Sequence, residues 1–413
     1  MSEWKETTIG TIPKDWKLIE AENYCVRVTD GTHDTPKQTT EGPLLITSKH
    51  IVGGRIDLES AYHISKEDFG EINKRSAVTK WDIIISMIGT VGEVVLVDKD
   101  EIDFAIKNVG LFVCNNELQG KWLKYYLKTP QARHYLKARL SGTTQKYITL
   151  GELRDFLIPT PKNSYEQEII VGVLSSLDDK IELLRKQNET LEAMASALFK
   201  HWFVDGAKET WDTGTLNSIL SVKGGTTPST VNSEYWNGII HWTTPKDLSN
   251  NPYIFLFDTE RTISKQGLDQ ISSGLLPVGT ILLSSRAPVG YLAITDIPVA
   301  VNQGYIAIID NKGYSKYFLY LWLKLNMRYI KANANGSTFR EISKSVFKSL
   351  ESIKPPKQLR LEFDRIVEPL FQKIRTNSKR IDTLTRLRDL LLLKLMSGEI
   401  RVEDINSNGK GNK

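Results

Sequence analysis

The chain has 413 residues, of which 40% are hydrophobic and 25% charged, and its formal net charge at pH 7 is +5. A folded chain of this length is expected to hold about two to four domains with real cores. No stretch approaches the roughly 18 to 20 consecutive apolar residues that a membrane-spanning helix needs, and the N-terminus has no signal-peptide pattern. We therefore expect a cytoplasmic protein with no membrane partner, whose mild positive charge is compatible with a polyanionic ligand.

Catalytic and metal-binding signatures are missing from the sequence. Cys25 and Cys114 cannot form a disulfide framework and lack the paired spacing of a zinc site, so we expect two buried thiols. The six histidines are scattered without metal-ligand spacing. There is no nucleotide-binding loop, nucleophile elbow or metalloprotease motif. The sequence predicts neither a catalytic residue nor a metal ligand in this chain.

Residues 16–203 are repeated in diverged form at residues 211–396. The matched segments are short, but their order is kept over about 190 residues per copy, which unrelated loops would not produce. One unit used twice is expected to bind two similar targets. The matches pair Trp16 with Trp211, a Gly/Thr/Pro turn at 31–36 with one at 225–228, 47–49 with 244–246, 83–92 with 281–290, Asn108-Val109-Gly110 with Asn302-Gln303-Gly304, and Gly142 and Thr144 with Gly336 and Thr338.

A long helix is predicted at the end of each copy. Ser164 and Gln167 have capping-box spacing and open the first helix, while Gly206 and Gly398 follow the two helices as stop signals. Pro369 is expected to kink the second helix near its start or to mark where its regular part begins. Seam residues fall alternately three and four apart, as in a left-handed coiled coil. They are Leu177, Ile181, Leu184, Asn188, Leu191, Leu198, Trp202, Leu370, Ile374, Asn377, Ile381, Leu384, Leu391 and Leu395.

The apolar seams predict that the two helices pack on each other. Antiparallel packing is favoured, because residues 204–210 and a whole globular unit must connect the end of the first helix to the start of the second. This arrangement would relate the two copies by a pseudo-two-fold axis. Asn188 and Asn377 lie in the seam, where they either fix the register of the pair or are satisfied by water or a nearby loop. The exposed flanks of the helices can still recruit other helices.

Polar segments that recur at matching places are the best binding candidates. Taken singly, each is an ordinary surface loop, but the recurrence favours a function. Glycine permits close backbone approach, hydroxyls and amides can bond phosphates or base edges, and amides pair bidentately with adenine. Arg286 replaces Met87 or Ile88 in a matched apolar run, as expected if two copies of one scaffold read different bases. The predicted DNA-binding residues are Lys49, Lys107, Asn108, Thr143, Thr144, Gln145, Lys146, Tyr147, Lys246, Arg286, Asn302, Gln303, Ser337, Thr338 and Arg340.

The duplication, the matched loops and three further segments give the chain a family resemblance. The segments are Gly10-Thr11-Ile12-Pro13-Lys14-Asp15-Trp16, residues 198–205 (LFKHWFVD) and residues 392–400 (LLKLMSGEI). Over residues 4–403 the chain resembles the specificity subunit of type I restriction-modification systems. The resemblance implies a non-catalytic subunit without a cofactor of its own. Its two target-recognition domains would each grip one half of an interrupted, asymmetric site in double-stranded DNA.

The resemblance also implies partners and an organisation. Two methyltransferase subunits, which use S-adenosylmethionine, would bind the helices, and restriction subunits, which use ATP and Mg²⁺, would join through them. The implied fold is α+β, with two repeated mixed α/β recognition domains separated by an antiparallel helix pair. The expected segments are a first recognition domain at 1–163, a first long helix at 164–204, a second recognition domain at 205–356, a second long helix at 357–400 and a flexible tail at 401–413.

Two other functions stay open from the residues alone. The first is a coiled-coil adaptor whose two domains bind protein or glycan rather than DNA, because mild basicity does not separate these ligands. The second is a self-sufficient methyltransferase, which the missing cofactor loops disfavour.

Overall fold

The computed structural model describes residues 3–336 and 340–401. Contacts divide the chain into two compact units: unit 1 comprises the described residues of Met1–Lys180 and Leu384–Lys413, and unit 2 comprises those of Ile181–Thr383. Each unit contains one mixed α/β head and part of each long helix. The predicted segments treat each long helix as a separate piece, whereas the compact units divide both helices, since each helix contributes side chains to the core of both units.

Unit 1 is built on a four-stranded antiparallel sheet in the order β10-β9-β12-β4. A second sheet, β11-β5-β8, contains the parallel pair β11 and β5, and β13 pairs with β3. The strands are β1 (Trp4–Thr7), β2 (Gly10–Pro13), β3 (Lys17–Glu20), β4 (Arg27–Asp30), β5 (Thr39–Ile46), β6 (Ile51–Val52), β7 (Arg55–Ile56), β8 (Tyr62–His63), β9 (Ile83–Ser86), β10 (Val94–Leu96), β11 (Phe104–Ile106), β12 (Val109–Val113) and β13 (Leu157–Thr160). The short helices are α1 (Ala21–Tyr24), η1 (Ser48–His50), α2 (Lys66–Ser76), α3 (Glu117–Lys128), α4 (Pro130–Lys137) and α5 (Leu150–Arg154).

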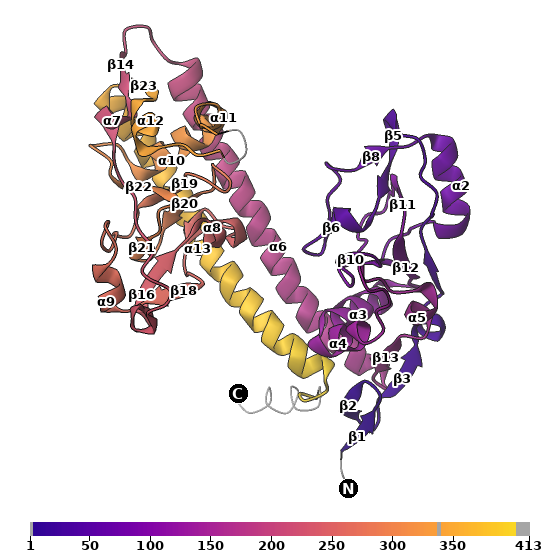
Figure 1. The fold of residues 1–413 in the computed structure, drawn as a ribbon. Helices are drawn as coiled ribbons and strands as arrows, with labels where there is room; N and C mark the ends of the chain where they lie inside the picture. The colour runs from indigo at the N-terminus through magenta and orange to yellow at the C-terminus, as the bar shows by residue number, and fades with distance from the viewer. Residues whose placement is uncertain (1–2, 337–339, 402–413) are drawn as a thin grey trace, which may run out of the picture. The chain divides into compact units, whose positions relative to one another are not determined.

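Unit 2 repeats the main elements of this design, with a five-stranded sheet in place of the four-stranded one. Its sheets are β15-β22-β19-β20-β17, β18-β16-β21 and β14-β23. The strands are β14 (Asp212–Thr215), β15 (Ser221–Lys223), β16 (Trp236–Thr243), β17 (Phe255–Leu256), β18 (Arg261–Ile263), β19 (Ile281–Ser284), β20 (Leu292–Thr295), β21 (Val299–Val301), β22 (Tyr305–Asp310) and β23 (Glu351–Lys354). The short helices are α7 (Leu216–Ile219), η3 (Ser233–Tyr235), α8 (Pro245–Asn250), α9 (Lys265–Asp269), α10 (Lys316–Leu325), α11 (Met327–Ala332) and α12 (Lys344–Ser349). Figure 1 shows α2 beside β5 and β11 in unit 1, and α9 beside β16 and β18 in unit 2.

The predicted duplication is therefore present in the fold. The Gly/Thr/Pro turn shows why glycine is kept at the same position in both copies. A Cβ on Gly31 would lie 2.3 Å from the carbonyl oxygen of Ile106, and a Cβ on Gly225 would lie 1.6 Å from that of Val301. Any side chain at either position would force the turn away from the neighbouring strand, β11 or β21. Glycine at both places keeps the same close approach in the two units.

The long helices are α6 (Ser164–Lys200), which continues into the π-helical turn η2 (His201–Asp205), and α13 (Lys357–Met396). The predicted capping box at the start of α6 is wrong. Asn163 precedes the helix and accepts a hydrogen bond from the Tyr165 amide at 3.0 Å, while Gln167 donates to the Tyr24 hydroxyl at 3.0 Å. The short amide side chain of Asn163 satisfies one of the free N–H groups of the first turn.

In each unit the two helices run antiparallel. In unit 1, Asp178 of α6 accepts a hydrogen bond from Arg388 of α13 at 2.9 Å. In unit 2, the rings of Phe199 near the end of α6 and Phe363 near the start of α13 lie 5.8 Å apart. All fourteen predicted seam residues are buried or half-buried. The pseudo-two-fold relation between the units stays a prediction.

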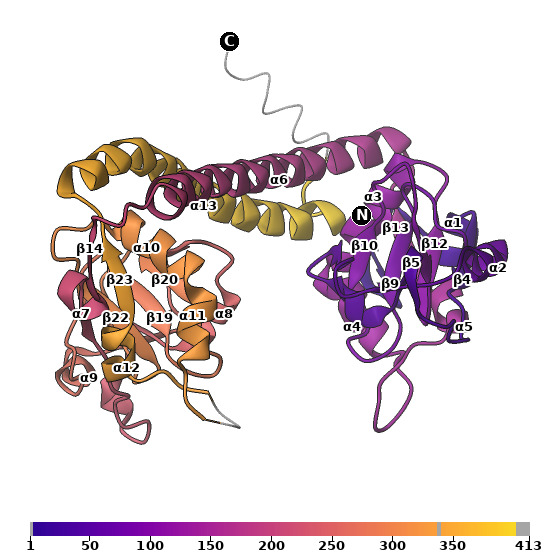
Figure 2. The same ribbon diagram turned by 90° about the horizontal axis from the view of Figure 1, so that it is seen from above.

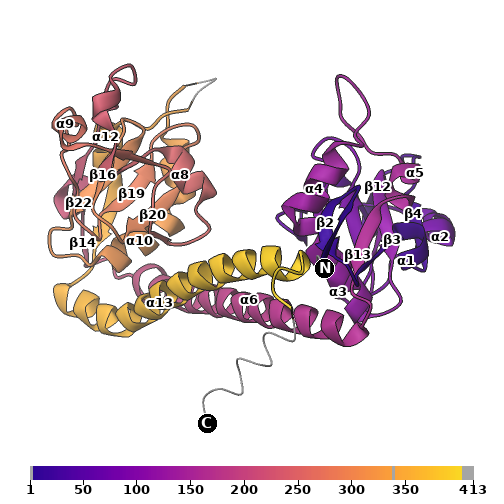
Figure 3. The ribbon, with the colours of Figure 1, turned by 90° about the horizontal axis from the view of Figure 1, so that it is seen from below.

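Helix α13 is continuous through Pro369. Its gold first half changes direction and then runs on without a break (Figure 3). A proline inside a helix removes one backbone hydrogen bond and bends the axis, so a bend rather than an interruption is the expected outcome. The start at Lys357 shows that Pro369 does not mark the beginning of the regular helix.

Two smaller expectations concern the cysteines and the tail. Cys25 and Cys114 are free and buried, as predicted, and a hydrogen bond with Cys25 together with burial raises the pKa of the Cys114 thiol. Of the predicted tail, only Arg401 is described; it pairs with Asp15 at 2.8 Å and with Glu166 at 2.9 Å, and residues 402–413 lie outside the described residues. Among the described helices, none is long and apolar enough to cross a bilayer.

Candidate nucleic-acid interface

A buried serine closes the turn after the central strand of each head. In unit 1, Ser86 at the end of β9 accepts a hydrogen bond from the Glu93 amide at 2.9 Å. In unit 2, Ser284 at the end of β19 accepts from the Gly290 amide at 3.0 Å and donates to the Pro288 carbonyl at 2.8 Å. Both serines are at most 1% exposed. The hydroxyl satisfies backbone groups that a tight turn cannot pair, so the turn is held in a defined shape.

A hairpin loop is attached to each of these turns by backbone hydrogen bonds. In unit 1, Ser141 and Tyr147 exchange two bonds of 2.9 and 3.1 Å, and Tyr147 bridges to Ile88 of the turn. In unit 2, Asn335 and Glu341 exchange bonds of 2.9 and 2.8 Å, and Glu341 bridges to Arg286. Arg286 therefore occupies the place of Ile88, which decides between the two matches left open by the sequence.

The tip of the unit 1 hairpin is exposed at Thr143, Thr144, Gln145 and Lys146, and Tyr147 is 41% exposed. Figure 2 shows this loop, between α4 and α5, extending from the side of unit 1 that faces away from α6. In unit 2 the equivalent loop follows α11. Arg340 is described and exposed, whereas the predicted residues Ser337 and Thr338 lie outside the described residues.

The second predicted segment, Lys107 and Asn108 with Asn302 and Gln303, follows β11 in unit 1 and β21 in unit 2. The match of Asn108 with Asn302 in the repeat alignment is wrong by one position. The Lys107 amide donates to the last residue of β5 at 2.8 Å, and the Asn302 amide donates to the last residue of β16 at 3.1 Å, so these two residues are equivalent. Strand β12 begins two residues after Lys107, but β22 begins three residues after Asn302. Asn108 therefore matches Gln303, and Gly304 is an additional residue that a match by residue type cannot reveal.

Threonines of the Gly/Thr/Pro turns hold this segment in both units. Lys107 donates from its amine to the Thr35 hydroxyl, and the Thr227 hydroxyl donates to the Gln303 side-chain oxygen at 2.8 Å. The Asn108 side-chain oxygen contacts a ring nitrogen of His33 at 3.0 Å. Within the described residues, the side-chain nitrogens of Asn108 and Gln303 have no partner, so both remain available as donors.

The two predicted lysines outside these segments lie on matching capped turns. The Thr47 amide donates to Nδ1 of His50 at 2.9 Å, and the Thr244 amide donates to the Asp247 carboxylate at 2.7 Å. Lys49 and Lys246 follow these caps and are exposed. Lys246 forms an ion pair with Glu260 at 2.9 Å, and the bond to Glu260 raises the lysine pKa.

Unit 2 brings three of the predicted residues to one place. Lys246, Arg286 and Asn302 line the same hollow of about 370 Å³, together with Tyr291 and Ser249. No partner of the Arg286 guanidinium occurs among the described residues. A cation and amide groups around one open hollow can bond base edges or phosphates. In unit 1, the Ser48 hydroxyl, beside Lys49, donates to the Asn108 carbonyl at 3.3 Å, so those two predicted residues also lie close together.

Sequence reasoning missed the acid that organises the unit 1 segment. Asp30, at the end of β4, is 4% exposed and pairs with His33 at 3.1 Å and with Arg75 of α2. Asp30 is not repeated in unit 2, so the comparison of copies gave no signal for it. Within the ranges 3–336 and 340–401, no group of three or more His, Cys, Asp or Glu side chains is arranged to hold a metal ion.

Comparison with known proteins identifies the family to which the chain belongs. The family model described as type I restriction modification DNA specificity domain matches the chain twice, over residues 40–193 and 208–386. The chain belongs to this family. It is a DNA sequence-specificity subunit of type I restriction-modification, and the comparisons give no support to a protein- or glycan-binding adaptor.

Individual relatives agree with this assignment. The specificity subunit is 37% identical to the specificity subunit of type I restriction enzyme MjaIX from Methanocaldococcus jannaschii, with 98% of each chain covered. It is 27% identical to the HindI specificity subunit from Haemophilus influenzae, over 79% of this chain and 88% of that one. The S subunit of a type I system from M. genitalium shares the fold, with a TM-score of 0.57, 21% identity and coverage of 92% of this chain and 96% of that one.

Proposed function

We propose that this specificity subunit binds an interrupted, asymmetric site in double-stranded DNA, and that each unit reads one half of it. The observation that carries the proposal is one scaffold with different side chains at the same places. Ile88 in unit 1 stands where unit 2 has Arg286, and Lys107 stands where unit 2 has Asn302. Arginine pairs with guanine and asparagine with adenine, so a change of these side chains changes the preferred base.

The accessibility and the support of these residues agree with a role in binding. Every predicted DNA-binding residue that the structure describes is exposed or half-buried. The backbone around them is held by buried groups such as Ser86 and Ser284, which limits the loss of conformational entropy on binding. A rigid frame with solvent-facing donors is what direct readout in the major groove requires.

The same proposal covers the partners. Two methyltransferase subunits would bind the helices α6 and α13 and bring S-adenosylmethionine to adenines that they flip out of the duplex. Restriction subunits, which use ATP and Mg²⁺, would join through the methyltransferases. The whole complex would act on foreign DNA in the cytoplasm, and the chain itself would contribute binding rather than catalysis.

The proposal is tested by co-expressing the chain with its methyltransferase and mapping methylated adenines over the host genome. We expect one motif with two defined parts separated by an unread gap, modified on both strands. A short continuous motif, or no methylation that depends on this chain, would contradict a bipartite reader.

A further inference from the structure

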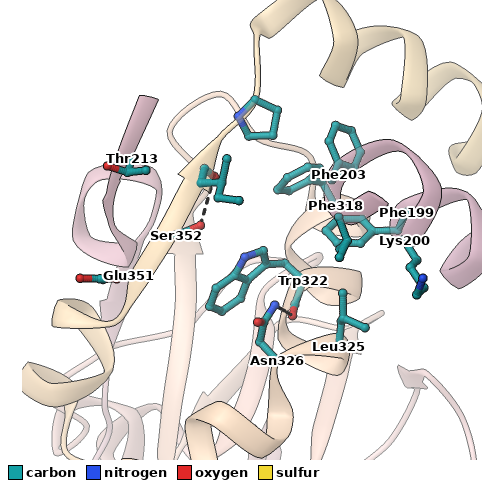
Figure 4. Close-up of a pocket in the computed structure, with 13 residues that line it drawn as sticks. Phe199, Lys200, Phe203, Thr213, Phe318, Trp322, Leu325, Asn326, Glu351 and Ser352 are labelled. Atoms are coloured by element: carbon teal, nitrogen blue, oxygen red, sulfur yellow. Dashed lines mark hydrogen bonds between the residues drawn. The ribbon is translucent and has the colours of Figure 1, made fainter. Parts of the chain in front are cut away.

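Unit 2 has an open apolar pocket at the end of α6. Its volume is about 440 Å³, and its walls include Phe199 and Phe203 from the helix end and Phe318 and Trp322 from α10 (Figure 4). This is many times the ~30 Å³ that one water molecule occupies in the liquid, and apolar walls offer water few hydrogen bonds. An open apolar hollow of this size is a feature of binding sites rather than of an ordinary surface.

Large apolar side chains at the edge of this pocket are left in solvent. Val204 is 46% exposed, Leu325 is 47% exposed and Ile353 is 38% exposed. They come from three different elements, η2, the end of α10 and β23. Their grouping around one hollow means that a single ligand could remove all three from water.

The matching place in unit 1 is filled by the chain itself. In unit 1 the helix that ends at this place is α13, whereas in unit 2 it is α6. Met396 is the counterpart of Phe203, which lies 193 positions earlier in the sequence. The N-terminal hairpin β1–β2 inserts Ile9 and Ile12, which are 6% and 1% exposed, into the core that contains Met396. Behind the hairpin, the ring of Trp16 lies 5.7 Å from that of Trp122 on α3.

The contacts of the hairpin show that the two places correspond. The Ile9 carbonyl accepts a hydrogen bond from Gln131 at 2.5 Å, at the start of α4 and directly after the junction with α3. The equivalent junction in unit 2, between α10 and α11, supplies Leu325 and Asn326 to the pocket wall. At the other side of the hairpin, a Cβ on Gly398 would lie 2.2 Å from Pro13, which places the hairpin against the end of α13.

Among residues 3–336 and 340–401, unit 2 has no segment that could cover the pocket in the same way. Only residues 206–211 connect η2 to β14, and this connection is too short for a hairpin that would reach across the pocket. Figure 4 shows Phe199 and Phe203 from the end of α6 and η2, Trp322 from α10 and Ser352 from β23 around the pocket. Unit 2 therefore has the pocket, but its described residues include no counterpart of the hairpin β1–β2.

We infer that this pocket is a docking site for an apolar hairpin or extended segment of a methyltransferase subunit, which takes the place that β1–β2 takes in unit 1. This inference rests on the proposed function for the identity of the partner. We infer the chemistry of the docked segment from the hairpin β1–β2. The segment should carry two aliphatic side chains like Ile9 and Ile12, and one of its backbone carbonyls should accept a hydrogen bond from the α10–α11 junction. Since the hairpin β1–β2 packs with Met396 in unit 1, the site is proposed for unit 2.

The test is a crosslinking experiment on the full-length chain. A photoreactive benzoylphenylalanine is placed at Leu325 in the pocket wall or, as a matched control, at Ile239 of β16, which is 94% exposed and outside the pocket. Each chain is co-expressed with its methyltransferase and irradiated. We expect a crosslink from position 325 to one methyltransferase segment with at least two large apolar residues, and none from position 239.

Affinity measurements on the same complex provide the second arm. L325K and V204K each put a charge into an exposed edge position and should leave the fold intact, and we expect each to weaken methyltransferase binding at least about tenfold. V231K, at a position that is 94% exposed outside the pocket, should bind as the wild type does. If the wild-type chain binds no methyltransferase, the proposed function fails. If it binds and both pocket variants bind equally well, or position 325 crosslinks only to a second copy of the chain, the docking site is overturned.

Discussion

The side-chain amide of Asn377 donates a hydrogen bond to the side-chain oxygen of Asn188 at 3.0 Å, across the two long helices in unit 2. Asn377 is fully buried in the helix seam, and Asn188 also donates to the Ser378 hydroxyl at 3.2 Å. The side-chain nitrogen of Asn377 reaches the side-chain oxygen of Asn188 only at one register, because a shift by one turn would break this bond. The contact favours the register role over local satisfaction by water or a loop.

Replacing one partner should therefore cost more than replacing both. N377L leaves the amide of Asn188 partly unpaired in the seam, and we expect the unfolding free energy of unit 2 to fall by about 1–3 kcal/mol. The double variant with N188L should recover most of this loss, because two leucines fill the seam without an unpaired polar group. Urea unfolding measures both. A double variant that loses the sum of the two single effects would argue against a direct pair.

Lys146 at the tip of the unit 1 hairpin is predicted to contact a DNA phosphate. K146A should weaken DNA binding and reduce the slope of log affinity against log salt by about 1, since one fewer counterion is released. K186A removes another exposed lysine, on α6, and serves as the matched control. A titration at several salt concentrations checks both variants. An unchanged slope for K146A would make this loop an ordinary surface connection.

Arg286 is predicted to determine a base in the half-site of unit 2. R286I copies the residue that unit 1 has at the same place, Ile88. We expect discrimination at one base position to fall by about 1–3 kcal/mol, the contribution of one bidentate contact to a base edge. Binding to a set of singly substituted DNA sites measures it. Loss of affinity that is uniform over all sites would instead make Arg286 a phosphate contact.

The caps before Lys49 and Lys246 should differ in their response to pH. His50 accepts a bond from the Thr47 amide and must be neutral at Nδ1 to do so. Burial, with help from Lys49, lowers the pKa of His50 below the ordinary histidine value of about 6.5. The unfolded chain therefore takes up the proton first. The cap contributes fully above pH 6.5 and is lost as the pH falls through the lower pKa of the folded chain.

Hydrogen exchange of two amides tests this difference within one sample. As the pH is lowered from 7.5 through the pKa of His50 in the folded chain, the Thr47 amide should lose protection after correction for the intrinsic rates. The Thr244 amide, which is held by the Asp247 carboxylate rather than by an imidazole, should keep its protection over the same interval. Equal loss at both amides would contradict the assignment to His50.

The duplication and the long helices were predictable because they depend on local chemistry that is visible in the sequence. Gly31 and Gly225 are required by the close approach of a neighbouring strand, and such positions survive divergence. The seam was predictable because its period is set by helix geometry. The burial of Phe199 and Phe371, which lie outside the seam, depends on the head of unit 2, and no helical period contains that information.

The details of the site were harder to predict from the sequence. The additional residue Gly304 shifts Asn108 onto Gln303, and only the hydrogen bonds of Lys107 and Asn302 reveal the shift. Asp178 illustrates another limit. It lies on α6, and although burial opposes ionisation, Lys124 and Arg388 hold its pKa at about 2. The three residues are far apart in the sequence, and a periodic pattern cannot show that they meet.

Exchanging the head of unit 2 tests the central claim most directly. Residues 211–354 are replaced by the corresponding segment of a relative with a different recognition sequence, and methylated adenines are mapped in cells that express the chimera with its methyltransferase. The account predicts a motif in which one part is that of the relative, while the other part and the length of the gap are unchanged. A motif in which both parts change would contradict the assignment of one half-site to each unit.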